Sequence, residues 1–97
     1  YTIIDMELEY DPAKRKQTLE KRGLDFEHCA ELFRGPILEQ EDRRNDYGEP
    51  RFIVCGLLDS RMVVVVWTPR GNKRRIISMR KANEREQQRF RKRLDRS

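Results

Sequence analysis

Residues 63–82 read V-V-V-V-W-T-P-R-G-N-K-R-R-I-I-S-M-R-K-A, so the most apolar run of the chain leads directly into a basic segment. Four valines and a tryptophan without alternation suit a central strand that is covered on both faces. The P-R-G-N sequence at 69–72 predicts a tight turn, after which Lys73–Arg80 returns as the neighbouring antiparallel strand. We expect the arginines of this pair at the rim of the buried sheet, where a fixed backbone and partial desolvation strengthen guanidinium–phosphate pairing.

A further strand is predicted before this pair. Residues 51–58 are expected to be extended and to turn at Asp59-Ser60 into the strand 62–68, which makes an antiparallel meander. Side chains alternate along an extended chain, so one face of the first strand should carry Arg51, Ile53 and Cys55. In the last strand the same alternation predicts two sets on opposite faces, namely Arg75, Ile77 and Met79 against Ile76, Ser78 and Arg80.

Two helices are predicted before the meander. A short strand at 7–10 is followed by Asp11-Pro12, which supplies an N-cap and a first helical residue, and this surface helix ends at Gly23. The second helix is capped by Asp25. It presents an apolar stripe to the core, formed by Phe26, Cys29, Ala30 and Phe33.

A last helix is predicted after the meander, with Asn83 as N-cap and Glu86 completing a capping box. A short strand is expected to start at Ile37-Leu38, and the polar residues 39–50 predict a long loop or a frayed hairpin. The whole pattern indicates an α+β fold with two N-terminal helices, an antiparallel sheet with a central meander, and a C-terminal helix. We expect one domain spanning residues 1–97, with residues 1–5 an upstream extension or an expression-derived addition, because Met6 makes a natural start.

Charge is distributed unevenly along the chain. Residues 1–69 hold 10 lysines and arginines against 14 acidic residues, whereas residues 70–97 hold 12 against 3. The last part therefore has a net charge of +9 and the first part a net charge of −4. A basic segment of this kind favours a polyanionic partner, although a solvated charged surface has the same composition.

Cysteine and histidine usage excludes several kinds of site. Cys29 and Cys55 lie among apolar neighbours without a C-x-x-C motif, which predicts two buried thiols. His28 is the only histidine and lies off the apolar stripe, so we expect it at the surface and exclude two-histidine nuclease chemistry. Acidic residues are scattered, so no metal and no other cofactor is predicted. No signal peptide or long apolar run is found, so a soluble cytoplasmic protein is expected.

The arginines and one glutamate form a pattern that suits chemistry on a phosphate. A guanidinium fork binds a phosphate in a bidentate manner and stabilises charge on pentavalent phosphorus. Glu49 precedes Arg51 by two residues, so both can face one side, where the carboxylate can act as a base toward a ribose hydroxyl. Salt bridges at the rim of the sheet explain the same residues without any reaction. Tyr47, in the polar loop, is a candidate for stacking on a base.

Several motifs resemble a known family. They are E-Y-D-P-A-K at 9–14, K-R-G-L-D-F at 21–26, G-E-P-R-F at 48–52, W-T-P-R-G at 67–71, R-I-I-S-M-R-K-A at 75–82 and N-E-R-E at 83–86. In this order and spacing they resemble the BrnT family, the toxin half of a type II toxin–antitoxin pair. The resemblance implies a RelE-like fold and a ribonuclease that blocks translation. It also implies a BrnA-like antitoxin with a ribbon-helix-helix domain, two toxins binding two antitoxins, and contact with DNA only through the antitoxin.

The resemblance also points to functional residues, at the matching positions Lys14, Glu49, Arg51, Arg70, Arg75 and Arg80. Together with the residue pattern, it predicts a catalytic set of Glu49, Arg51, Arg70, Arg75 and Arg80. The predicted RNA-binding set is Lys14, Tyr47, Lys73, Arg74, Lys81 and Arg85. Arg80 is expected to share the phosphate with the positive N-terminus of the last helix. Arg22 stands where the family often has histidine, and a guanidinium does not deprotonate, so no general acid is assigned.

The sequence is compatible with three functions. The leading one is a metal-independent endoribonuclease, in which the 2′-hydroxyl attacks the adjacent phosphorus and leaves a 2′,3′-cyclic phosphate, so that DNA is inert. The alternative is a non-catalytic nucleic-acid-binding module that uses the basic C-terminal third. The third is an interaction protein whose basic surface docks an acidic partner. Cleavage of RNA would support the endoribonuclease. Binding to DNA together with intact RNA would support the binding module, and no affinity for nucleic acid would support the interaction protein.

Overall fold

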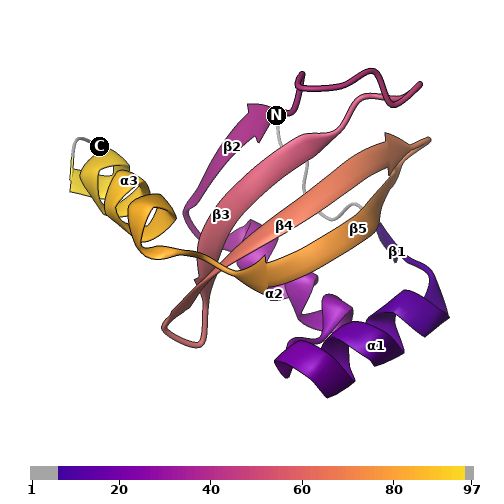
Figure 1. Cartoon of the computed structure of the whole chain (residues 1–97), viewed down its shortest axis with the longest axis horizontal. Coiled ribbons are helices and arrows are strands. Elements are labelled where there is room, and N and C mark those ends of the chain that lie inside the picture. Colours follow the sequence, from indigo (N-terminus) through magenta and orange to yellow (C-terminus); the bar gives the residue numbers. More distant parts are fainter. Residues whose placement is uncertain (1–6, 96–97) are drawn as a thin grey trace.

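The computed structural model describes residues 7–95, which form a mixed sheet with helices on both faces (Figure 1). The elements in chain order are β1 (Glu7–Glu9), α1 (Pro12–Arg22), the 3₁₀ helix η1 (Phe26–His28), α2 (Cys29–Arg34), β2 (Ile37–Glu41), β3 (Phe52–Leu58), β4 (Arg61–Arg70), β5 (Lys73–Lys81) and α3 (Glu84–Asp95). The predicted extension at residues 1–5, with Met6 after it, lies outside the described residues.

The sheet has the strand order β1-β5-β4-β3-β2, so β4 is central as its unbroken apolar run predicts. The meander β3–β4–β5 is confirmed, and Asp59 and Ser60 in its first turn both adopt a positive φ (52° and 67°). The expectation of a wholly antiparallel sheet is wrong, because β1 pairs with β5 in parallel. This pairing places Glu7 and Glu9 opposite Lys73 and Arg75, so opposite charges match across the two strands.

The first helix follows its sequence signals closely. The Asp11 side chain accepts a hydrogen bond from the Ala13 amide, Pro12 opens the helix, and Gly23 ends it in the left-handed conformation at φ 67°. None of its residues is buried, as predicted. Arg15 binds Asp25 through Nε at 2.8 Å, which ties α1 to the segment that leads into η1.

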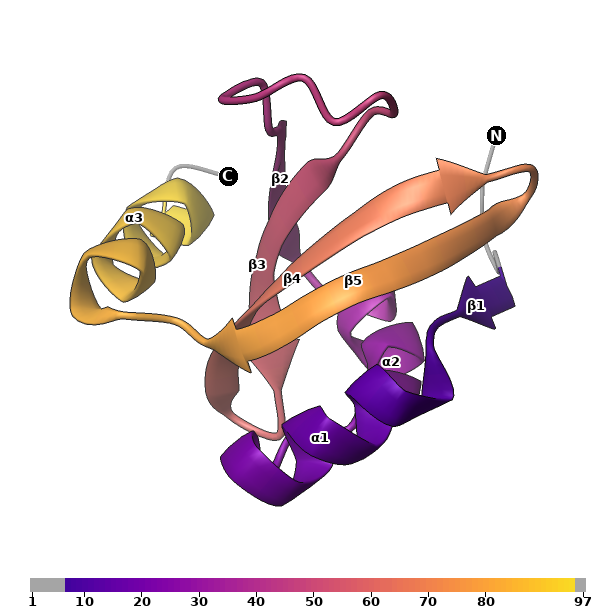
Figure 2. The same cartoon turned by 45° about the vertical axis from the view of Figure 1, so that its right-hand side comes forward.

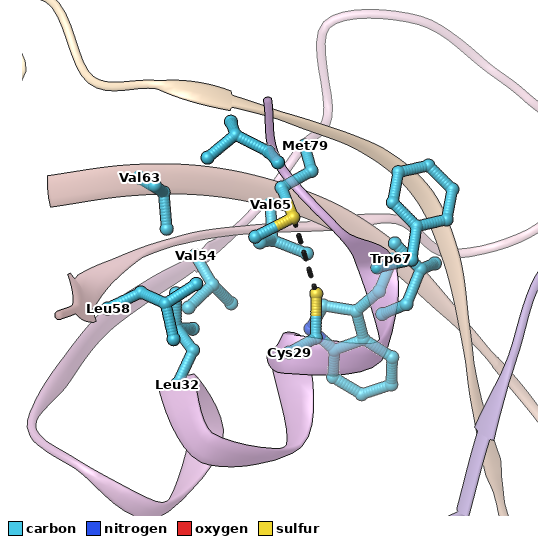
Figure 3. Packing of buried hydrophobic residues seen from close by; sticks show 11 residues of the cluster. Cys29, Leu32, Val54, Leu58, Val63, Val65, Trp67 and Met79 are labelled. Carbon is cyan, nitrogen blue, oxygen red and sulfur yellow. Dashed lines mark hydrogen bonds between the residues drawn. The ribbon is translucent and has the colours of Figure 1, made fainter. Parts of the chain in front are cut away.

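The main core lies between the sheet and the short helix α2 (Figure 3). Cys29 is buried there, and its Sγ donates to the Met79 Sδ at 3.9 Å. The predicted apolar stripe is right for Phe26 and Cys29 but wrong at its last turn. Leu32 is fully buried whereas Phe33 is only half-buried, because the first turn is a 3₁₀ helix and shifts the later positions around the axis.

Gly56 explains how closely α2 approaches the sheet. A Cβ atom at this position would lie 3.0 Å from Leu32 Cγ and 3.1 Å from Ile37 Cγ2. Only glycine leaves room for the leucine to pack directly on the β3 backbone. This contact fixes the helix against the middle of the sheet.

A register shift in β5 changes which of its side chains share a face. Val66 pairs with Ser78 but Trp67 pairs with Ile76, so Ile77 is an extra residue without a partner in β4. Ile76 and Met79 are therefore both buried on the α2 side. The predicted strict alternation is wrong here, and Arg75 and Arg80 lie on the same face of the sheet instead of opposite faces.

The other face of the sheet is partly covered by α3. Phe90 packs there with Cys55, Val64 and Ala82 in a second apolar cluster, on the side of the sheet away from α1 and α2 (Figure 2). The predicted capping box is confirmed, since the Asn83 and Glu86 side chains each accept from the other's amide. Cys29 and Cys55 are free buried thiols and His28 is exposed, as predicted. No helix within residues 7–95 is long and apolar enough to span a membrane.

Candidate functional site

The loop between β2 and β3 is held in place by its own side chains. The buried Asp42 accepts two hydrogen bonds from the Arg44 guanidinium and one from the Tyr47 hydroxyl. The Arg44 hydrogen bonds hold the pKa of Asp42 well below its usual range. The Asp42 amide donates to the Arg51 carbonyl at 2.7 Å, which closes the loop at its base. At the far end the buried Thr68 hydroxyl donates to the Pro50 carbonyl at 2.6 Å, which fixes the segment that carries Glu49 on β4.

Glu49 lies between two of the predicted catalytic arginines. Its Oε1 accepts from Arg70 Nη2 at 3.3 Å, and its Oε2 lies 3.8 Å from Arg51 Nε. The Arg51 guanidinium lies over the Tyr47 ring, 3.9 Å from its centroid, and makes no hydrogen bond to another residue in the described part of the chain. The end of β4, the start of β3 and the loop thus bring together one carboxylate and two guanidinium groups, as the sequence predicts.

Arg75 joins this group from β5, beside Arg70. Its Nη1 donates to Glu9 Oε2 at 2.8 Å. This hydrogen bond lowers the pKa of Glu9, and the charges of Arg75, Arg70 and Lys73 lower it further. Arg70 is therefore close both to Glu49 and to the Glu9–Arg75 pair. We call Glu49, Arg51, Arg70 and Arg75 the arginine cluster.

Arg80 lies apart from the arginine cluster, on the same face of β5 but beside α3. Its Nη1 and Nη2 each donate to a Glu86 carboxylate oxygen at 2.8 Å, and Nη1 also contacts the Lys81 carbonyl. This hydrogen bonding lowers the pKa of Glu86 to about 2. The guanidinium fork that was expected to face a phosphate is thus occupied by a carboxylate of the capping box.

The predicted RNA-binding residues do not form one surface. Tyr47 belongs to the loop beside Arg51. The Nζ of Lys73 lies 3.8 Å from Oε2 of Glu7, which is on the edge strand β1. Arg74 lies on the α2 side, where its guanidinium is 3.8 Å from the Phe33 ring centroid, and burial lowers its pKa. Lys81 and Arg85 are exposed near the start of α3, and Lys14 lies on α1.

Two residues that position the cluster were missed by the sequence analysis. Glu9 neutralises part of the charge of Arg75, and its place on a short alternating strand opposite β5 was the available signal. Thr68 is buried at the end of the apolar strand, where a hydroxyl requires a hydrogen-bond partner, and it anchors Pro50.

The arrangement can bind a phosphodiester and accept a proton beside it. The donors of the arginine cluster come from the segment just before β3, from the end of β4 and from β5. The Nε of Arg51 is buried, and its two Nη atoms make no hydrogen bond within residues 7–95. Carboxylates next to these arginines are acceptors for a hydroxyl proton. No group of three or more histidine, cysteine, aspartate or glutamate residues that could hold a metal ion occurs within residues 7–95.

Comparison with known sequences gives one match. A sequence model of the family described as "Ribonuclease toxin, BrnT, of type II toxin-antitoxin system" matches residues 10–86. The matched span contains the whole arginine cluster and the Arg80–Glu86 pair. No curated protein matches the chain.

Proposed function

The chain belongs to the BrnT family of ribonuclease toxins of type II toxin–antitoxin systems, and from this we propose that it is a metal-independent endoribonuclease whose reaction takes place at the arginine cluster. The observation that carries the proposal is the position of Glu49, which accepts a hydrogen bond from Arg70 and whose Oε2 lies 3.8 Å from Nε of Arg51. The Arg51 guanidinium makes no hydrogen bond within residues 7–95. A base and charge-stabilising donors are then adjacent, which is what cleavage next to a ribose hydroxyl requires.

In the proposed reaction the ribose O2′ attacks the neighbouring phosphorus as its proton passes to Glu49. The bond between phosphorus and O5′ breaks, so the products are a 2′,3′-cyclic phosphate and a 5′-hydroxyl, whose proton comes from water. Arg51 and Arg70 lie on either side of Glu49 and stabilise the extra negative charge on the phosphorane oxygens. Arg75, held by Glu9, supports the adjacent phosphate.

Arg80 has a different part in this proposal. Both ends of its fork bind Glu86, so it acts as a positioning residue that holds the start of α3 on the sheet. The half-buried Lys73 and the exposed Lys81 and Arg85 contribute to RNA affinity through salt-dependent attraction to the phosphates. Tyr47 supports Arg51 by a cation–π contact.

The proposal is tested by incubating the purified protein with single-stranded RNA in the presence of a chelator, and with DNA of the same sequence in parallel. We expect RNA fragments that end in a 2′,3′-cyclic phosphate and no cut in the DNA, because DNA lacks the nucleophile. RNA and DNA that are both bound and both intact would instead support the nucleic-acid-binding module. RNA fragments ending in a 3′-hydroxyl would contradict the role of the 2′-hydroxyl.

The proposed partner is a BrnA-like antitoxin with a ribbon-helix-helix domain. A type II family implies a protein antitoxin. The finer proposals are two toxins bound to two antitoxins, inhibition of translation in the cytoplasm, and a RelE-like fold, which the five-stranded sheet with helices on both faces supports. Light scattering of the co-expressed pair should give the mass of the four-chain complex, and a mass of one toxin with one antitoxin would contradict this stoichiometry.

A further inference from the structure

A groove between α1 and β5 has an unusual composition. Its volume is about 220 Å³. Its lining consists of Lys14, Gln17, Thr18, Lys21, Arg22, Ile77 and Ser78. The five residues from α1 recur at helical spacing and form one face of the helix, and that face is turned toward the sheet. We call this feature the α1 groove.

A helix next to a sheet normally turns its apolar face inward. Here the inner face of α1 is basic and polar, and no residue of the helix is buried. Contacts within the fold explain the inward position of two of these polar side chains. Arg22 donates to the Met79 carbonyl at 2.8 Å, and Lys14 donates to the Ile77 carbonyl at 3.5 Å. These contacts cover backbone acceptors of β5 beyond the end of β1.

The other polar residues of the groove have no such reason. Lys21 makes no ion pair or hydrogen bond with another residue in 7–95. Gln17 and Ser78 line the same groove, and the lining holds no acidic residue among those described. Lys21 is exposed, and together with Lys14 and Arg22 it gives the lining a positive potential that attracts an anion.

The position of the groove relates it to the arginine cluster. Arg75 pairs with Thr68 and Ser78 with Val66, so the two residues are separated by two steps of β4, about 7 Å along the strand. The extra residue Ile77 lies between them, and bulges are frequent beside functional sites because they redirect side chains and backbone groups. A chain of phosphates that passes over Arg75 can therefore continue across the edge of β5 into the groove.

We propose that the α1 groove is a second phosphate-binding site, which holds the RNA backbone a short distance from the arginine cluster, with Lys21 as its main cation. This inference rests on the proposed ribonuclease function. An RNA backbone fits better than an acidic segment of a protein, because its regularly spaced phosphates can occupy the arginine cluster and the groove together, and the groove offers little apolar surface to protein side chains. Ile77 is the one apolar residue in the lining.

The test uses the intact protein and a 2′-O-methyl oligoribonucleotide, which keeps the phosphates but cannot be cleaved by attack of a 2′-hydroxyl. Lys21→Gln is compared with Lys16→Gln, which removes the same charge from an exposed position of α1 outside the groove. We expect Lys21→Gln to weaken binding about 3–10-fold at low salt and to reduce the slope of log affinity against log salt by about 0.7, the value for one single-strand phosphate contact. Lys16→Gln should stay within about 2-fold of the parent.

Cleavage kinetics separate this inference from the proposed function. With cleavable RNA, Lys21→Gln should raise KM and leave kcat unchanged, because it removes binding outside the reacting atoms. If the two lysine variants bind the oligonucleotide equally well and RNA is still cut, the groove is not a phosphate-binding site, and the proposed ribonuclease function stands. If Lys21→Gln weakens oligonucleotide binding but the parent protein cuts no RNA, the proposed ribonuclease function is wrong, and the groove remains a phosphate-binding site. Loss of antitoxin binding alone in Lys21→Gln would assign the groove to the protein partner and also overturn it.

Discussion

The arginines that line one face of the sheet differ in how many of their donors are already bonded. The Arg51 side chain makes no hydrogen bond within the described chain, the Arg70 side chain makes one to Glu49, and the Arg75 side chain makes one to Glu9. Arg80 has both arms of its fork on Glu86. A phosphate must displace existing partners to be bound, so the Nη donors of Arg51 cost least to use, while its Nε is buried. Hydrogen-bond occupancy therefore separates residues that the sequence pattern treats alike.

Glu49→Gln tests the assignment of the base at this scale. The amide keeps an acceptor for Arg70 but cannot take a proton, so we expect the rate of RNA cleavage to fall by about 10²–10⁴ while RNA affinity is kept. Single-turnover cleavage and binding of a 2′-O-methyl oligonucleotide measure the two effects separately. Glu41→Gln is the control, since Glu41 is exposed and pairs with Arg43 in the same region. Parent-like cleavage by Glu49→Gln would require another base.

The sequence predicts which residues meet at Glu49, but not the faces of β5. Glu49 and Arg51 are neighbours in sequence, and the turn at 71–72 brings β4 and β5 together, so their convergence follows from local signals. The extra residue Ile77 leaves no mark in the residue pattern, since isoleucine occurs equally in regular strands. Strict alternation consequently misplaces Arg75 relative to Arg80. The Arg80–Glu86 pair could not be predicted either. The capping-box pattern identifies the hydrogen bond between Asn83 and Glu86, but it gives no sign that the same carboxylate also binds Arg80.

At the scale of elements, α3 is attached to the sheet by few interactions. Phe90 is its one buried residue within the described helix, and Glu86 joins its first turn to Arg80. A charge-assisted pair at this position links the attachment of α3 to pH, because it depends on an ionised Glu86.

The free energy of unfolding should therefore decrease at acidic pH, because protonation of Glu86 removes its ion pair with Arg80. The pKa of Glu86 is lowered from 4.5 to about 2, so its contribution is complete above about pH 4.5 and is lost as the pH falls toward 2. The contribution should stay below about 1 kcal/mol, since the Arg80 side chain is 43% exposed. Thermal melts at pH 6 and pH 3 should show Glu86→Gln less stable than the parent at pH 6, with a smaller difference at pH 3. Glu84→Gln on the same turn is the control, and an equal loss in both variants would contradict the role of the pair.

The attachment of α2 is tested by Leu32→Ala. Leu32 is fully buried against Gly56, so its truncation should lower the free energy of unfolding by about 2–5 kcal/mol. Phe33→Ala should cost less, because Phe33 is half-buried and lies at the edge of the core beneath Arg74. Urea unfolding of the two variants measures both values. A larger loss for Phe33→Ala would mean that α2 packs in the register first expected from the sequence.

At the scale of the whole molecule, the division of charge along the chain becomes a division in space. The basic part of the sequence forms the end of β4, β5 and α3, and acidic residues from the first part lie beside it at Glu7, Glu9 and Glu49. The salt bridges at the rim of the sheet, which the sequence allowed as an alternative explanation for these arginines, are therefore present. They hold the arginines in place. Composition predicts the polyanionic partner, whereas only the fold shows that the Nη donors of Arg51 make no hydrogen bond within residues 7–95.

The central claim is that RNA is cleaved at the arginine cluster, and the single-turnover rate of RNA cleavage by Arg51→Ala tests it most directly. Removing one preorganised donor should lower this rate by about 10²–10³, and Arg51→Lys should restore it only in part because an ammonium keeps the charge but lacks the fork. Arg43→Ala, an 81% exposed arginine of the same loop, should cleave within about 2-fold of the parent rate. Melting curves establish that all three variants are folded. Parent-like cleavage by a folded Arg51→Ala would contradict the account.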